Sequence, residues 1–286
     1  MFSYRHAFHA GNHADVLKHM VLVHLLHHFR QKEKAFWFID THAGAGAYDL
    51  RGDHAKKSGE SRSGIAQLWD RSDLPEALSL YREEVGRFNT GLGGSKDALR
   101  YYPGSPRIAM QMLREHDRLR LFERHSTDSR ELSQSVEGEA PRVIAQDLDG
   151  YDGMTALLPP PARRGMVLID PSYEDKADYH RVIAALKGGL ERFATGTFMV
   201  WYPLVKRREA QQFPERLRRV QTKEWLHATL TVKAAGVDGL GLNGSGIFII
   251  NPPWTLPKAL ASALPYLVEV LGQDQTADFS LENTIK

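Results

Sequence analysis

The segment that decides the fold is Phe36-Trp-Phe-Ile-Asp-Thr-His-Ala-Gly-Ala-Gly-Ala-Tyr48. It begins as an apolar run that ends at Asp40 and continues as a loop of small residues at 43–47. A short apolar run of this kind is typical of a parallel strand buried on both faces. Glycines in the turn after such a strand let a ligand approach the backbone. The segment therefore predicts the first strand of an α/β sheet with a ligand-binding loop at its carboxyl end.

The glycine pattern of this loop indicates the kind of ligand. A dinucleotide fingerprint needs a third glycine three residues after the second, and that position is Asp49. The loop therefore favours a nucleoside cofactor over a dinucleotide, which disfavours a nicotinamide-dependent oxidoreductase. A glycine turn that binds no ligand is the alternative.

Composition limits the class of protein. The 286 residues, 42% of them hydrophobic, are enough for one large domain or for a domain with an insert. The chain has no apolar run long enough to span a membrane and no signal-peptide core, so we expect a cytoplasmic protein without a membrane partner. With no cysteine, disulfides and thiolate metal sites are excluded. The net charge of +2 permits a nucleic-acid partner.

The N-terminal region is rich in histidine. Residues 1–11 are predicted to form an extended arm that contains Tyr4, and Asn12 is predicted to cap a following helix. The helix has apolar residues at helical spacing, namely Val16, Leu17, Met20, Val21 and Leu25. The histidines are irregularly spaced and no acidic cluster completes them, so we predict no metal site. We expect them to face solvent or a cofactor.

Acidic residues follow the predicted strands. The set is Asp40 after the first strand, Glu123 after 119–122, Asp147 and Asp149 after 142–145, and Asp170 after 166–169. Because the carboxyl ends of parallel strands meet at one edge of a sheet, we expect these side chains to surround one ligand site. Asp147 and Asp149 are alternatives for contacting the cofactor base. Asp149 is preferred because Gly150 permits a close turn.

The spacing of these residues predicts an insert. The acidic residue that binds ribose hydroxyls ordinarily lies about 20 residues after the glycine loop, but Glu123 lies about 80 residues after Gly44. We therefore predict an inserted helical subdomain at 51–100, within a domain formed by 1–50 and 101–286. An insert here would overhang the ligand end of the sheet, where a large substrate docks; a purely structural elaboration is the alternative. The next helix is predicted to begin with Ser105 as N-cap and Pro106 at its first position.

The motif Asp170-Pro-Ser-Tyr173 gives the site its chemistry. The order of the strand-end residues resembles the class I S-adenosylmethionine-dependent methyltransferases, and this motif resembles their Asp-Pro-Pro-Tyr motif, which acts on exocyclic amines of nucleobases. The Asp170 carboxylate and the Pro171 carbonyl can accept the two amine hydrogens and align the nitrogen for direct displacement. Asp170 can also accept the departing proton. Tyr173 offers a ring on which a base removed from its helix can stack.

Ser172 stands where the family motif has a second proline. Serine does not fix φ, so the loop is less stiff before a ligand binds. Both hydrogen-bond acceptors are retained, and we therefore expect Ser172 to affect the rate rather than the reaction. Asn251-Pro-Pro-Trp254 matches the amine-methylation pattern more literally, but it follows a later strand. We predict that it forms a rigid turn.

The sequence as a whole is similar to the RlmJ family, which methylates N6 of adenine 2030 in bacterial 23S ribosomal RNA. The similarity extends over nearly the whole chain and rests on five segments: Tyr4–His19, Asp40–Gly46, Tyr101–Pro106, Arg163–Gly165 and Ile250–Trp254. It implies a Rossmann-like sheet with helices on both faces and a small inserted helical subdomain. It also implies a monomer that acts on protein-free RNA.

The resemblance assigns roles to individual residues. It implies that S-adenosylmethionine, without a metal, is bound by His19, His42, Gly44, Ser105, Glu123, Asp149, Gly150 and Asp170. It implies that Asp170 is catalytic, together with Pro171 and Tyr173 of its motif, and that Tyr4 engages the substrate.

Other functions remain open at this point. A DNA adenine-N6 methyltransferase is one alternative. The 2′-hydroxyl distinguishes RNA from DNA, and no feature of the sequence indicates a contact with it. A nucleic-acid-binding protein that lost activity through Ser172 is the alternative from a different class. The basic segment 206–219 and the insert residues Lys56, Lys57 and Arg62 are candidate phosphate contacts or simply solvated surface.

Overall fold

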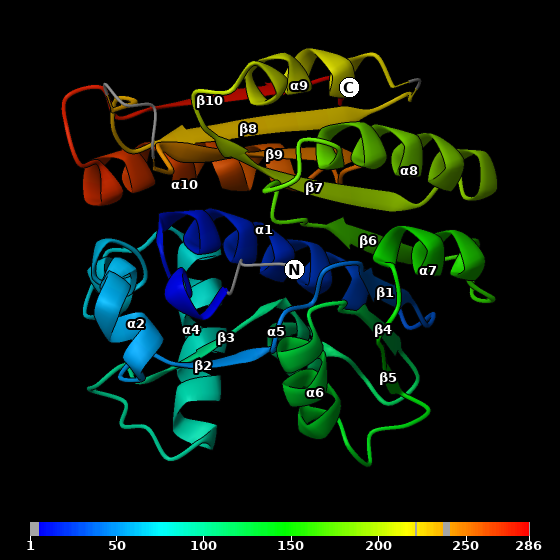
Figure 1. Ribbon diagram of the computed structural model, residues 1–286, viewed down its shortest axis with the longest axis horizontal. Helices are drawn as coiled ribbons and strands as arrows, with labels where there is room; N and C mark the ends of the chain where they lie inside the picture. The colour runs from blue at the N-terminus through cyan, green and yellow to red at the C-terminus, as the bar shows by residue number, and fades with distance from the viewer. Residues whose placement is uncertain (1–5, 221, 237–240, 286) are drawn as a thin grey trace.

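The computed structural model describes residues 6–220, 222–236 and 241–285, apart from the side chains of His54 and Lys56. Its main feature is an eight-stranded sheet with the order β10-β8-β9-β7-β6-β1-β4-β5 (Figure 1). The parallel strands are β1 (Trp37–Asp40), β4 (Arg118–Phe122), β5 (Val143–Gln146), β6 (Gly165–Ile169) and β7 (Thr197–Leu204). The antiparallel strands are β8 (Trp225–Thr231), β9 (Gly244–Ile250) and β10 (Asp278–Asn283). The predicted α/β class is confirmed.

Helices cover both faces of the sheet. One face packs against α1 (His13–Arg30), α4 (Glu76–Gly91), α5 (Ser105–Met112), α6 (Ser126–Ser135) and α10 (Leu256–Leu271). The other face packs against α7 (Gly150–Leu157), α8 (Asp178–Arg192) and α9 (Arg208–Arg218). A separate apolar core lies on each face of the sheet. In β6, Met166 and Leu168 pack into the core on the α1 side and Val167 and Ile169 into the core on the α8 side, which explains why the strand is a continuous apolar run.

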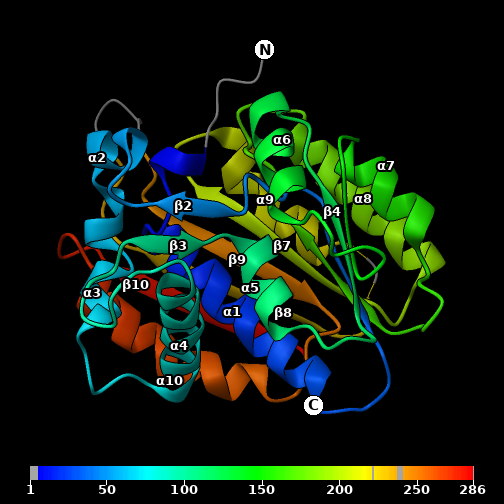
Figure 2. The ribbon, with the colours of Figure 1, turned by 90° about the horizontal axis from the view of Figure 1, so that it is seen from below.

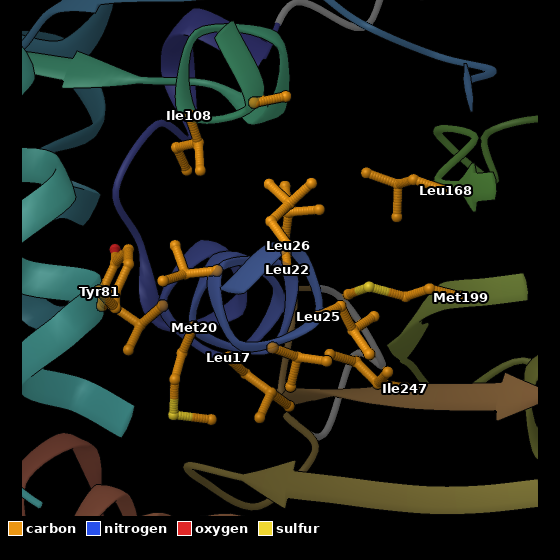
Figure 3. Close-up of a cluster of buried hydrophobic side chains, with 14 of the residues drawn as sticks. Leu17, Met20, Leu22, Leu25, Leu26, Tyr81, Ile108, Leu168, Met199 and Ile247 are labelled. Carbon is orange, nitrogen blue, oxygen red and sulfur yellow. The ribbon is translucent and has the colours of Figure 1, made fainter. Parts of the chain in front are cut away.

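Helix α1 lies in the middle of the first core. Fourteen of its 18 residues are buried, and it packs against α4, α5, α10 and β9 (Figure 2). Figure 3 shows its leucines between Tyr81 of α4, Ile108 of α5 and Ile247 of β9. The predicted cap is confirmed, because the Asn12 side chain accepts hydrogen bonds from Ala14 N and Asp15 N. Lys18, His19 and Asp15 are thereby carried into the interior on a helix that has little exposed surface.

The segment between β1 and α5 is largely helical, as predicted. It contains α2 (Asp53–Ser58), the 3-10 helix η2 (Glu60–Ser63), α3 (Ala66–Trp69) and α4. The two ends of the segment meet in an antiparallel ribbon of β2 (Ala47–Asp49) and β3 (Tyr101–Pro103), seen in Figure 2. Side chains of α4 join the same core as α1. The division at residues 51 and 100 into a separate subdomain stays a prediction.

Two local expectations differ from the structure, and two features were not predicted. The unpredicted features are β10, which pairs with β8, and the β2–β3 ribbon. Ser105 is the first residue of α5 and Gly104 is its N-cap. The described part of the arm is not extended throughout, because His6–Phe8 form the 3-10 helix η1. Among the described helices, none has both the length and the apolar character needed to cross a membrane.

Candidate active site

A pocket of about 370 Å³ opens at the carboxyl ends of the parallel strands. Three strand-end residues line it together, namely Glu123, Asp149 and Asp170. Asp147 does not line it, which agrees with the preference for Asp149. Asp40 is fully buried and accepts a hydrogen bond of 2.6 Å from Ser105 Oγ, which does line the pocket. The sheet therefore brings the sequence-selected residues to one place.

The glycine loop at 43–47 is hydrogen-bonded to Glu123. Gly44 has a φ of +62°, a conformation that favours glycine, and its amide donates to Glu123 Oε2 at 2.8 Å. The second carboxylate oxygen accepts from His125 N at 2.7 Å. Burial raises the pKa of Glu123, and these two amide hydrogen bonds oppose the rise. The carboxylate is thus fixed at the pocket wall with acceptor capacity left for a ligand hydroxyl.

Asp149 and Gly150 form the next part of the wall. The Asp149 carboxylate caps α7 by accepting from Tyr151 N at 3.0 Å, and it also accepts from Arg124 Nη1 at 3.1 Å. A Cβ atom on Gly150 would lie 1.9 Å from the Thr41 carbonyl oxygen. Only glycine fits this contact between the loops that follow β1 and β5.

Lys18 of α1 is a site residue that the sequence reading missed. Its Nζ donates to Asp170 Oδ2 at 2.7 Å and lies 3.0 Å from Asp15 Oδ1. The other Asp15 oxygen bonds His6 Nε2 at 2.9 Å and Gly11 N at 2.8 Å. The available signal was a lysine among apolar helix positions, since a buried lysine needs an acidic partner. The partner itself lies too far away in sequence to be identified by pattern.

The charges of this cluster follow from burial and pairing. Burial raises the pKa of Asp170, and the charge and hydrogen bond of Lys18 oppose that rise. Burial alone would lower the pKa of Lys18, but Asp15 and Asp170 outweigh it and hold that pKa above its usual range. Lys18 is therefore charged and favours an ionised Asp170.

His19 and His42 both line the pocket. Burial lowers the pKa of His19 to about 3 and that of His42 to about 4, so both rings are neutral near pH 7. His19 Nδ1 lies 2.7 Å from the Tyr102 hydroxyl, and His42 packs edge-on against Tyr151. Neutral imidazoles of this kind can donate or accept a hydrogen bond with a ligand.

The stacking role predicted for Tyr173 is wrong for this structure. Its ring is 2% exposed, packs against Tyr179 and Phe213, and does not line the pocket. The hydroxyl donates to Trp201 O at 2.7 Å. The backbone φ of +54° turns the side chain away from the pocket side of the motif. Tyr173 therefore anchors the turn, while Asp170, Pro171 and Ser172 face the pocket.

Two further predictions concern Tyr4 and the motif at 251–254. Tyr4 lies outside the described residues. Asn251 begins the turn after β9. Because β9 runs antiparallel to β7, this turn lies at the amino ends of the parallel strands, opposite the end where the pocket opens. The Asn251 amide donates to Ala194 O and Gly196 O, both at 2.8 Å. Asn251-Pro-Pro-Trp254 therefore forms a turn at a strand end, as predicted, and its rigidity stays a prediction.

The pocket chemistry fits a nucleoside that carries a positive charge. Glu123 can accept from ribose hydroxyls, Gly44 and Gly150 leave room at the backbone, and Asp170 adds negative charge near the centre. Among the described residues, no group of three or more His, Asp or Glu is arranged to hold a metal. A Rossmann-like sheet with an acidic pocket at its strand ends is the architecture of the class I methyltransferases, the class to which we assign this site.

Comparison with known proteins names the family. Residues 33–284 match the family described as ribosomal RNA large subunit methyltransferase D, RlmJ, and the chain belongs to this family. Ribosomal RNA large subunit methyltransferase J of Haemophilus influenzae is 42% identical over 282 residues, which are 99% of this chain and 98% of the relative. The protein of the same name from Escherichia coli is 43% identical over 93% of each chain.

A solved structure supports the fold. The crystal structure of a Legionella pneumophila protein matches with a TM-score of 0.87 and 35% identity. The match covers 97% of this chain and 99% of that one. The architecture described above is therefore shared over nearly the full length.

Proposed function

We propose that this protein transfers a methyl group from S-adenosylmethionine to the exocyclic N6 of an adenine in 23S ribosomal RNA. The observation that carries the proposal is Asp170, which lies at the end of β6 in the same pocket as Glu123 and Asp149. The proposed amine acceptor and the proposed nucleoside-binding residues thus share one cavity. The family and its two named relatives support a large-subunit RNA as substrate.

Different residues of the chain would contact different parts of the cofactor. Glu123 would accept from the ribose hydroxyls, and Asp149 with the Gly150 backbone would contact the base. The polar groups of His19, His42 and Ser105 line the remaining wall beside Gly44. The cofactor supplies a methyl group on a positively charged sulfur. No metal takes part in the proposed reaction.

Asp170 and Pro171 would orient the target amine. The Asp170 carboxylate and the Pro171 carbonyl each accept one N6 hydrogen, which directs the nitrogen lone pair at the methyl group. The N–C bond would form as the methyl–sulfur bond breaks, with the bonding electron pair leaving on the now neutral sulfur. The positively charged nitrogen would then release one proton, and Asp170 lies where that proton can go. Lys18 favours the ionised form of Asp170 before the transfer. Trp201 and Pro203 line the pocket and offer apolar surface to the base.

The substrate is proposed to be protein-free RNA, bound by a monomer in the cytoplasm. Some basic residues of the segment 206–219 have other partners, since Arg207 donates to Tyr173 O and Arg218 pairs with Glu282. Lys206 and Arg208 are exposed and remain candidates for phosphate contacts.

Methyl transfer from labelled S-adenosylmethionine to unmodified 23S rRNA tests this function. We expect the digested RNA to contain labelled N6-methyladenine, and we expect Asp170→Ala to yield none. Asp147→Ala is the matched control, because Asp147 is exposed and lies outside the pocket.

Cofactor binding without label in RNA would contradict the proposal. Label in DNA would then indicate a DNA adenine methyltransferase. Absence of label in either nucleic acid would indicate a binding protein.

A further inference from the structure

The end of the pocket formed by His9, Asn12 and Glu60 has no role in the proposed transfer. All three residues line the same cavity as Asp170. Glu60 is held tightly: His9 Nδ1 lies 3.0 Å from each carboxylate oxygen, and Asn12 Nδ2 donates to Oε2 at 2.9 Å. Of the described residues in the segment 51–100, Glu60 is the one that lines this pocket.

The position of Glu60 is fixed relative to α1. Ile65 N, just after η2, donates to Gly11 O at 2.8 Å. A Cβ atom on Gly64 would lie 2.1 Å from the same oxygen. The chain around η2 is therefore packed backbone to backbone against the start of α1, and Glu60 is a preorganised wall residue.

Helix α1 sets the distance between Glu60 and the reacting centre. Lys18 touches Asp170, and Asn12, six residues earlier, touches Glu60. A helix rises 1.5 Å per residue, so the backbone positions of Asn12 and Lys18 are separated by about 9 Å along the axis. In an adenine nucleotide the exocyclic amine and the sugar lie at opposite ends of the base. A nucleotide with its amine at Asp170 can therefore place its ribose near Glu60.

The chemistry of Glu60 suits a ribose hydroxyl. An ionised carboxylate has about four acceptor positions and donates nothing, and the partners of Glu60 are His9 and Asn12. Hydrogen bonding to Glu60 raises the pKa of His9, so the pair tends toward neutrality and does not repel a nearby phosphate. The 2′-hydroxyl is the donor that distinguishes RNA from DNA.

We propose that Glu60, positioned by His9 and Asn12, accepts a hydrogen bond from the 2′-hydroxyl of the target nucleotide and makes the site selective for ribose. The inference rests on the proposed function. It assigns to the 51–100 segment a specificity residue that faces the substrate.

Two synthetic RNA fragments around the mapped adenine test the inference. They are identical except that one has 2′-deoxyadenosine at the target. A hydrogen bond to a charged group is worth roughly tenfold or more in binding, so we expect the parent to prefer the ribose fragment by about that factor in kcat/KM. Glu60→Ala should reduce the preference to about twofold or less, mainly by loss on the ribose fragment. Glu60→Gln should be intermediate, because an amide oxygen still accepts.

Glu83→Ala is the matched control, since Glu83 is exposed on α4 of the same segment and does not line the pocket. It should keep the parent preference. Equal rates of the parent on both fragments, or a full preference in Glu60→Ala, would overturn the inference while leaving the methyltransferase function intact. Full-length 23S rRNA is the positive control, and its lack of methylation by the parent would instead overturn the proposed function and the inference with it. If Glu60→Ala unfolds, the ratio for Glu60→Gln decides.

Discussion

Lys18 Nζ and Asp170 Oδ2 lie 2.7 Å apart, although 152 residues separate them in the chain. The ammonium group comes from the buried helix α1, and the carboxylate comes from the turn after β6. Lys18 is 5% exposed, so water screens this pair poorly. The charge of the proposed amine acceptor is therefore set by an element that precedes the sheet.

Replacing Lys18 by methionine should move the acidic limb of the pH–rate profile to higher pH. Burial raises the pKa of Asp170, and Lys18 opposes that rise. Without the ammonium group, Asp170 becomes protonated at higher pH, by about one unit or more, and loses its function as an acceptor. Methyl transfer measured from pH 5 to 9 checks this. Lys187→Met, an exposed change on α8, should leave the limb unmoved; a Lys18 variant with an unshifted limb would contradict the assigned role.

Asp40 should make the fold less stable as pH rises. Burial raises the pKa of Asp40 to about 7, with Asp170 adding to the rise and Ser105 and Lys18 opposing it. Between pH 4 and 7 the folded chain holds a proton that the unfolded chain has released. The resulting stability is fully present below about pH 4 and is lost as pH rises through 7.

Asp40→Asn should remove this dependence. Between pH 5 and pH 8 the parent is expected to lose about 2 kcal/mol more unfolding free energy than the variant. Urea unfolding at both pH values measures the difference. Equal losses in the two proteins would argue against a protonated Asp40.

Proline at position 172 should stiffen the catalytic turn. Ser172 lines the pocket, and Tyr173 anchors the turn through its buried ring. A proline compatible with the local backbone reduces the freedom of the unfolded chain and adds about 0.4–1 kcal/mol of stability. We expect Ser172→Pro to raise both the melting temperature and kcat, with Ser172→Ala as control. A lower melting temperature would mean that the turn here does not accept the φ of proline.

A side chain at Gly150 should disturb the cofactor end of the pocket. The added Cβ of Gly150→Ala would lie 1.9 Å from Thr41 O, and overpacking of this kind costs about 1–3 kcal/mol. Isothermal calorimetry with S-adenosylmethionine should show weaker binding. Gly188→Ala on α8 is the matched control, because its Cβ meets no atom within 4 Å. It should stabilise the helix by about 0.5–1 kcal/mol and leave binding unchanged.

Strand ends were predictable because their signal is local. The runs before Asp40 and Asp170 alternate between two apolar cores, so each reads as a continuous apolar segment followed by a charge. The run before Glu123 contains Arg120, but Leu119, Leu121 and Phe122 still contribute to the two cores. Parallel pairing then requires those charges to meet. The β10 strand escaped prediction because it is a polar edge strand, whose outer face needs no apolar pattern.

The remaining site features depend on packing between distant segments. Lys18 and Glu60 reach the pocket only because α1 and η2 pack where they do, and neither has a local motif. The Tyr173 ring was predicted on the wrong side because its orientation depends on a positive φ and on an aromatic cluster with α8 and α9. Neither property can be read from four residues of sequence.

The central place of α1 has a consequence for biosynthesis. Ribosomes release the N-terminus first, yet α1 packs against β9 and α10, which end at Ile250 and Leu271. The nascent chain therefore carries an apolar helix without these partners until residues 244–271 have been synthesised. Late closure of such distant contacts is slow and exposes apolar surface meanwhile. We therefore expect chains stalled before β9 to expose apolar surface of α1 that a chaperone can bind.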